Sequence, residues 1–209
     1  NRAVSYNHKI IDQKYHLKGL VNDDVCKKLI QFYEEKKHMT ESEESYKFNE
    51  DKVITDNFNC LNISKYKDNM GFQGPYEIIV NYIRKVVANY EVFIRNTLCP
   101  NFKNVFFTNT RNIRILKYDV GQHIKDHSDI DEYIRGSLTI NLNDNYEGGE
   151  FRFFGGKERF KLSAGEAMIF PAEPIWIHGT EPITKGSRYS INCFLRMDDG
   201  AGQWVPLLV

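Results

Sequence analysis

The chain has 209 residues, which is the size of one domain with a sizeable core. Its 28 basic and 28 acidic residues cancel, so the composition shows no footprint for nucleic acid or an anionic membrane surface. No apolar run approaches the roughly 20 residues that span a bilayer, and the first residues lack an apolar signal-peptide core. We therefore expect a cytoplasmic protein with no membrane and no nucleic-acid partner. The four cysteines lack CxxC spacing, which predicts reduced thiols.

Two helices are expected in the first hundred residues. The first begins at Asn22 or Asp23, either of which can cap a helix, and ends near Lys37. Its apolar stripe repeats at helical spacing and consists of Val25, Leu29 and Phe32. The second begins at Pro75 and ends near Thr97, with the strongest helical period in the chain. We expect both helices to form a supporting layer on a core that follows them.

Residues 39–74 separate the two helices and are rich in glutamate, lysine and asparagine without a clear period. This pattern predicts a long loop or flexible flap, with one short strand around Val53–Ile54. Long loops in compact domains often carry function, so we expect this segment to lie over the mouth of a site. Residues 1–100 would then be a helical support layer with a flexible loop.

After Pro100 the sequence changes to short β-like runs separated by glycine, aspartate and asparagine turns. The predicted strands cover residues 112–118, 123–127, 136–142, 150–154, 159–162, 167–170, 176–178 and 188–196. This spacing predicts a mainly β protein with flanking helices (α+β), whose core over 101–196 is a double-stranded β-helix, or jelly roll. Residues 197–209 are expected to be a loose tail, and 1–209 a single domain.

The last predicted strand has two different faces, because side chains alternate along a strand. One face is apolar and consists of Tyr189, Ile191, Cys193 and Leu195, while the other is mixed and consists of Arg188, Ser190, Asn192, Phe194 and Arg196. The strand at 136–142 divides in the same way, with Thr139 and Asn141 on its polar face. We expect the apolar faces to pack on the helices and the polar faces to line a cavity that holds a ligand.

A candidate metal site is formed by His127 and Asp129, which leave the same face of an extended segment, together with the later His178. Two imidazoles and one carboxylate form the facial triad that suits non-haem Fe(II) and leaves coordination positions open. Taken alone, this pattern is a weak signal, because ordinary core or surface histidines and a turn-capping aspartate produce it as well. His123 precedes His127 by four residues, about 13 Å on a strand, and is left out of the ligand set.

Arg188 follows the second histidine and opens the last strand on its polar face. A guanidinium is always charged and presents a fork of donors, so it can hold a carboxylate in one orientation inside a cavity. A dicarboxylic co-substrate could chelate iron at one end and contact Arg188 at the other, with the hydroxyl of Tyr118 as a second donor. The alternative is an ordinary surface arginine.

The span 112–196 resembles the catalytic core of Fe(II)/2-oxoglutarate (2OG)-dependent dioxygenases, and most closely the prolyl 4-hydroxylase-like branch. The matching segments are Lys117-Tyr118-Asp119-Val120-Gly121-Gln122, His127-Ser128-Asp129, Leu142-Asn143-Asp144, Gly148-Gly149-Glu150, Gly165-Glu166-Ala167-Met168-Ile169-Phe170, His178-Gly179 and Gly186-Ser187-Arg188-Tyr189-Ser190. Their order and spacing fit that family over about two fifths of the chain.

The resemblance implies a single catalytic domain over 1–209 and a role for each candidate residue. The iron ligands would be His127, Asp129 and His178. The distal carboxylate of 2OG would be bound by Arg188 and Tyr118, and the co-substrate pocket would be lined by Thr139 and Asn141. The implied cofactors are Fe(II), 2OG as co-substrate and O₂. Ascorbate is compatible with the resemblance as a further cofactor. The implied reaction hydroxylates a C–H bond and releases succinate and CO₂.

The same resemblance implies a prolyl residue in a peptide or protein as the substrate. Two positions depart from these relatives. Many collagen-type relatives have lysine at the position of Arg188, and many prolyl hydroxylases have tryptophan at the position of Phe194. A free amino acid, a small metabolite or a non-prolyl protein residue therefore stays open as the substrate. A non-catalytic jelly-roll binding module is a third reading, against which the intact triad argues. Arg135, near the expected mouth, could contact a peptide carbonyl or be an ordinary surface arginine.

Overall fold

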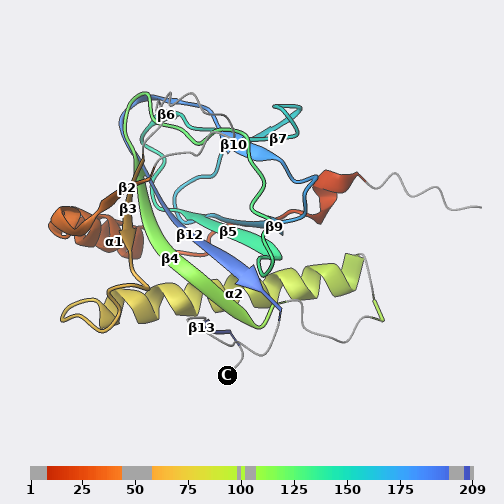
Figure 1. Ribbon diagram of the computed structural model, residues 1–209, viewed down its shortest axis with the longest axis horizontal. Helices are drawn as coiled ribbons and strands as arrows, with labels where there is room; N and C mark the ends of the chain where they lie inside the picture. The colour runs from red at the N-terminus through yellow and green to blue at the C-terminus, as the bar shows by residue number, and fades with distance from the viewer. Residues whose placement is uncertain (1–8, 44–57, 98–99, 102–106, 198–204, 208–209) are drawn as a thin grey trace, which may run out of the picture.

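The computed structural model describes residues 9–43, 58–97, 100–101, 107–197 and 205–207 (Figure 1). Two α-helices are α1 (Asp23–Glu35) and α2 (Gln73–Thr97), and two short 3-10 helices are η1 (Ile10–Gln13) and η2 (Lys37–Met39). The strands are β1 (Tyr15–Leu17), β2 (Glu41–Glu43), β3 (Phe58–Asn62), β4 (Asn109–Tyr118), β5 (Gly136–Asn141), β6 (Glu147–Gly148), β7 (Phe151–Phe153), β8 (Glu158–Phe160), β9 (Ala167–Pro171), β10 (His178–Thr180), β11 (Ile183–Lys185), β12 (Arg188–Arg196) and β13 (Val205–Pro206).

One large antiparallel sheet organises the molecule. Its strand order is β1-β9-β5-β12-β4-β3-β2, and β13 also pairs with β4. Two small sheets, β10-β7-β8 and β11-β6, lie on one side of this sheet, and α2 runs along its other side (Figure 1). This arrangement confirms the predicted mainly β fold with a jelly-roll core and two supporting helices.

The helices form where the sequence predicts them. The side chain of Asn22 accepts a hydrogen bond of 3.0 Å from the backbone N–H of Val25, which identifies Asn22 as the N-cap of α1. The second helix starts at Gln73, so Pro75 lies in its first turn, where a missing N–H costs little. The apolar faces of both helices pack against the large sheet in one core.

The two faces of β12 confirm the predicted division of the sheet. Ile191, Cys193 and Leu195 are fully buried in the core that includes the helices. The opposite face, with Arg188, Ser190, Asn192 and Phe194, lines a cavity between the large sheet and the small sheets. The alternation along one strand thus separates a dry core from a polar site.

Three expectations about the elements are corrected. Residues 123–127 are not a strand, because only His127 forms a bridge there, and the strand expected at 176–178 begins instead at His178. The segment between the two helices is not a loop alone, since β3 extends the large sheet beyond β4. Such pairing depends on partners far away in the chain, which a local pattern does not contain.

The expected flap and the expected tail contain more regular structure than predicted. Within 39–74 the chain forms β2, β3 and the start of α2, while the strand expected at Val53–Ile54 lies outside the described residues. In the expected tail, Val205 and Pro206 pair with Thr110 and Asn109 of β4. This part of the chain therefore lies on the sheet and is not loose.

Candidate active site

The site is built on a backbone bridge between His127 and His178. The N–H of each residue donates to the carbonyl of the other, with both donor–acceptor distances 2.9 Å. In such a pair the two Cα atoms are about 5.5 Å apart and the side chains leave the same face. The bridge therefore brings the two imidazoles together, with their ring centroids 4.4 Å apart.

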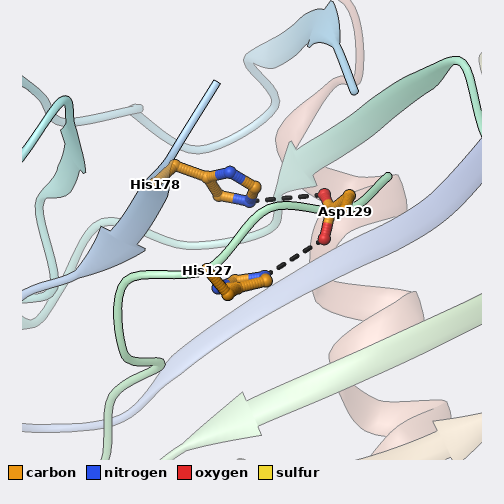
Figure 2. A group of neighbouring side chains, drawn as sticks. All are labelled: His127, Asp129 and His178. Carbon is orange, nitrogen blue, oxygen red and sulfur yellow. Dashed lines mark ion pairs between the residues drawn. The ribbon is translucent and has the colours of Figure 1, made fainter. Parts of the chain in front are cut away.

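Asp129 completes a three-residue cluster with the two histidines (Figure 2). Its Oδ1 atom lies 3.1 Å from Nε2 of His127, and its Oδ2 atom lies 3.3 Å from Nε2 of His178. One ligand atom from each residue lies within 4.8 Å of the other two. This is the donor set of a facial triad, which can hold a divalent iron on one side and leave the other side open.

Backbone carbonyls fix the orientation of both imidazoles. Nδ1 of His127 lies 2.7 Å from the carbonyl oxygen of Lys125, and Nδ1 of His178 lies 3.0 Å from that of Trp176. A carbonyl only accepts, so each Nδ1 carries a proton and donates, and a ring that gives up its second proton keeps the lone pair on Nε2. Both lone pairs can therefore be directed at an ion placed next to Asp129.

The electrostatics of the cluster favour an ionised carboxylate. Burial acts to raise the pKa of Asp129, but hydrogen bonds from both histidines outweigh it and hold this pKa far below its usual range. Burial acts to lower the pKa of His127, but the hydrogen bond and charge of Asp129 outweigh it and raise this pKa above its usual value. Ser137 also donates a hydrogen bond to Oδ2 of Asp129. The site thus keeps a negative charge ready for a cation.

Arg188 carries a buried positive charge in the same cavity. Its side chain is 2% exposed, and its Nε donates a 3.0 Å hydrogen bond to Oδ1 of Asn141. The centre of its guanidinium group lies 4.5 Å from the ring centroid of Phe151 and 5.5 Å from that of Tyr118. Within the part of the chain that the structure describes, no carboxylate pairs with it. A buried charge without a partner is costly, so the guanidinium is set to receive an anion.

Tyr118 lies beside Arg188 because the two residues pair directly between β4 and β12. Burial raises the pKa of Tyr118 to about 12, although the charge of Arg188 opposes this shift. The phenol is therefore protonated at neutral pH and can donate a hydrogen bond. Arg188 and Tyr118 together offer donors to the same anion.

The cavity has a volume of about 700 Å³ and joins all these groups. Six of the seven predicted site residues line it, namely Tyr118, His127, Asp129, Thr139, His178 and Arg188. The seventh, Asn141, is fully buried behind Arg188 and orients its guanidinium. The structure thus brings the predicted residues together, while their individual roles stay predictions.

Comparisons with known proteins place this geometry in a family. The family model described as the 2OG-Fe(II) oxygenase superfamily matches residues 113–196. Residues 113–196 belong to this oxygenase superfamily. A PKHD-type hydroxylase from Methylobacterium nodulans is 36% identical over 90 residues, which cover 35% of this chain and 38% of that protein. A Synechococcus PKHD-type hydroxylase is 30% identical, with 40% of its length covered, so the match spans about two fifths of these relatives.

Solved structures share the fold of this oxygenase core at low sequence identity. A prolyl hydroxylase from Trichoplax adhaerens, in complex with a hypoxia inducible factor oxygen degradation domain peptide fragment, has a TM-score of 0.63. It is 12% identical, and the match covers 88% of this chain and 84% of that one. A Pseudomonas putida prolyl-4-hydroxylase has a TM-score of 0.58 at 14% identity, with 89% and 93% covered. Among the residues that the structure describes, no helix has the length and apolar character needed to cross a membrane.

An aromatic wall closes one side of the oxygenase cavity. The ring of His178 lies 4.8 Å from that of Phe170 and 5.7 Å from that of Phe153, measured between centroids. Phe151 and Phe170 line the cavity itself, while Trp176 is buried behind them in the same cluster. Aromatic side chains therefore lie beside the metal-site residues.

Several residues around the oxygenase site were not predicted. Ser137 was overlooked although it lies on the same strand face as Thr139, a signal that could have identified it. Glu43 and Arg114 also line the cavity, and only the pairing of distant strands places them there. Arg135 was expected near the mouth of the site, but it does not line the cavity. Its guanidinium donates to the backbone carbonyls of Asp131, Glu132 and Ile134 in its own loop.

Proposed function

We propose that the chain is a Fe(II)- and 2OG-dependent hydroxylase that acts on prolyl residues of peptides or proteins. One observation carries the proposal: the cluster of His127, Asp129 and His178 shares a single cavity with Arg188, a buried cation that no carboxylate of the described residues pairs with. A site for a divalent ion next to a site for an anion is what a chelating dicarboxylic acid requires. The match of residues 113–196 to the 2OG-Fe(II) oxygenase superfamily supports this reading.

Different residues of the chain would bind the metal and the co-substrate. The two Nε2 atoms and the Asp129 carboxylate would hold the iron, while Arg188 and Tyr118 would bind the distal carboxylate of 2OG. When bound, the iron supplies the O₂ chemistry that hydroxylates a C–H bond while 2OG is converted to succinate and CO₂. The wall of Phe151 and Phe170 keeps water away from the reacting groups, which protects such chemistry from side reactions.

The prolyl substrate rests on the relatives and on the size of the cavity. Cavities of about 300–1,000 Å³ enclose ligands of drug size, so a cavity of about 700 Å³ exceeds the need of one small dicarboxylic acid. A second ligand can therefore enter beside the co-substrate. Two structural neighbours are prolyl hydroxylases, one of them in complex with a peptide fragment. We accordingly propose a proline-containing peptide as that second ligand.

The test is 2OG turnover in the presence of candidate substrates. Purified protein with Fe(II), 2OG and ascorbate, added to keep the iron reduced, is incubated with a panel of proline-containing peptides. We expect succinate formation that depends on peptide, and a mass gain of one oxygen atom on a prolyl residue. His127→Ala should abolish both signals, whereas His123→Ala, a histidine outside the cavity lining, should retain them.

The competing readings give different results in the same assay. Turnover that is stimulated by free amino acids or metabolites, and by none of the peptides, would contradict the prolyl assignment. Protein that binds metal and 2OG but forms no succinate under any condition would indicate a non-catalytic binding module.

A further inference from the structure

The cavity contains a second polar group, apart from Arg188, made of Glu43, Arg114 and Asn192. We call these three residues the Arg114 triplet. Nη1 of Arg114 donates to Glu43, and its Nη2 donates a 2.7 Å hydrogen bond to Oδ1 of Asn192. All three residues line the cavity. Along β12, Asn192 lies four positions from Arg188, about 13 Å at the usual rise of a strand.

Strands that are distant in the sequence assemble the triplet. Asn192 on β12 pairs with Arg114 on β4 and, on its other side, with Thr139 on β5. Glu43 comes from β2 at the outer end of the same sheet. The triplet therefore lies on the side of the cavity toward β2 and β3, while Thr139 connects it to the centre of the sheet.

The two arginines of the cavity differ in charge balance. Arg188 has no carboxylate partner among the described residues, so its end of the cavity has a net positive charge. Arg114 is paired with Glu43, so the triplet is neutral overall. A neutral group gains little from binding a second carboxylate, but it can bind a neutral polar group.

The hydrogen bond from Arg114 fixes the orientation of the Asn192 side-chain amide. A guanidinium only donates, so the atom that faces it must be the Oδ1 acceptor. The Nδ2 donors then point to the other side of the amide, and no other described residue accepts a hydrogen bond from them. Since Asn192 is partly exposed and lines the cavity, these donors are available to a ligand.

We propose that the Arg114 triplet is the substrate-binding part of the cavity, in which Nδ2 of Asn192 donates a hydrogen bond to a neutral carbonyl oxygen of a peptide main chain. This inference rests on the proposed function, because it assigns the rest of the cavity to iron and 2OG. The charges of 2OG are matched by the metal site and by Arg188. The neutral triplet is left for an uncharged ligand group.

The same geometry disfavours a free amino acid. A zwitterion presents a carboxylate and an ammonium group, which would gain most by separating Arg114 from Glu43 and pairing with each of them. That exchange breaks an ion pair that is already made between a mostly buried arginine and a partly exposed glutamate. A peptide carbonyl uses only the open donors of Asn192 and leaves the ion pair intact.

The test separates the donor from the rest of the triplet. Asn192→Asp keeps an acceptor for Arg114, removes the Nδ2 donors and adds a negative charge, while Asn192→Leu removes donor and acceptor without adding a charge. Asn59→Asp makes the same chemical change on β3, at a residue outside the cavity lining, and is the matched control. The probes are capped proline-containing peptides and free proline. Peptide KM is measured by turnover, and peptide and 2OG affinities are measured by calorimetry on Mn(II)-loaded protein.

We expect Asn192→Asp to raise the KM and the dissociation constant for the capped peptides about tenfold, the usual size of one lost hydrogen bond. The affinity for 2OG should stay unchanged, and Asn59→Asp should behave as the wild type. Capped peptides should bind more tightly than free proline.

Four results would overturn the inference. One is an unchanged peptide affinity in both Asn192 variants, and another is a parallel loss of 2OG affinity, which would assign Asn192 to the co-substrate. The third is a preference for free proline, and the fourth is wild-type protein that binds no peptide but still consumes 2OG. If the wild type neither binds nor consumes 2OG, the proposed function itself fails, which is a distinguishable result.

Discussion

His127 and His178 lie 51 residues apart in the sequence, yet they are direct backbone partners that exchange two hydrogen bonds of 2.9 Å. The bridge joins the loop after β4 to the start of β10, and Asp129 follows two residues later in that loop. The position of the metal-site residues is thus set by main-chain pairing. Hydrogen bonds then orient the three side chains: the two imidazoles contact the carbonyl oxygens of Lys125 and Trp176, and Ser137 donates to Asp129.

Replacing any one of the three clustered residues should remove metal binding. In His127→Ala, Asp129→Ala or His178→Ala, two donors remain, which are too few to hold a divalent ion in a facial arrangement. Calorimetry with Fe(II) under anaerobic conditions, or with Mn(II), should show one site in the wild type and none in these variants. His123→Ala should bind as the wild type does, and loss of binding in that variant would contradict the assigned ligand set.

Arg188→Met should weaken 2OG binding by about 10- to 100-fold, the range expected when a charge-assisted hydrogen bond is lost. Arg188→Lys should fall between this variant and the wild type, because lysine keeps the charge but loses the fork and the bond to Asn141. The affinity is measured by titrating 2OG into Mn(II)-loaded protein. Arg135→Met is the matched control, since that guanidinium lies outside the cavity lining and donates to carbonyls of its own loop. Equal losses in both would refute the role of Arg188.

Gly179→Ala tests whether the backbone bridge positions the ligands. A Cβ atom at Gly179 would lie 2.7 Å from Oδ1 of Asp126 and 2.8 Å from the carbonyl oxygen of Ile124, so the loop that carries His127 must move away from β10. We expect metal affinity to fall about 10- to 100-fold, as for other changes that disturb ligand orientation. Gly74→Ala, in α2, meets no atom within 4 Å and should leave metal affinity unchanged. Wild-type affinity in Gly179→Ala would show that the bridge does not control the site.

Metal binding should strengthen as the pH rises through the range in which His127 loses its proton. The pKa of His127 is raised above its usual value of about 6.5, so in metal-free protein its pairing with Asp129 stabilises the fold below that value and is lost as pH increases through the raised pKa. The pKa of Asp129 is lowered, so its contribution is present above the ordinary carboxyl range of about 4 and is lost only in strong acid. A cation competes with the His127 proton and wins at higher pH.

The measurement is the increase in Tm caused by Mn(II), followed from about pH 6 to about pH 8. We expect this increase to grow with pH in the wild type and to be absent at every pH in His127→Ala. A metal-induced shift that shrinks as the pH rises would contradict this account of the cluster.

Much of the site is predictable because its chemistry lies in local patterns. The spacing of His127 and Asp129, the alternating faces of β12 and the N-cap at Asn22 each involve neighbours in the sequence. The geometry of such neighbours follows from the helix and strand periods alone. The prediction of a strand at residues 123–127 was wrong because it used the local pattern alone. The bridge formed in this segment joins His127 to His178, which is distant in the sequence.

The sequence by itself therefore determined which residues could bind a metal and a dicarboxylate, and which strand faces could enclose them. The tertiary structure decided which residues meet. It placed Asn141 behind Arg188 and left Arg188 without a carboxylate partner in the described chain, and it joined Glu43 to Arg114 across 71 positions. Strand order and register are set by long-range packing of the whole sheet, and a one-residue shift would turn every one of these side chains to the other face.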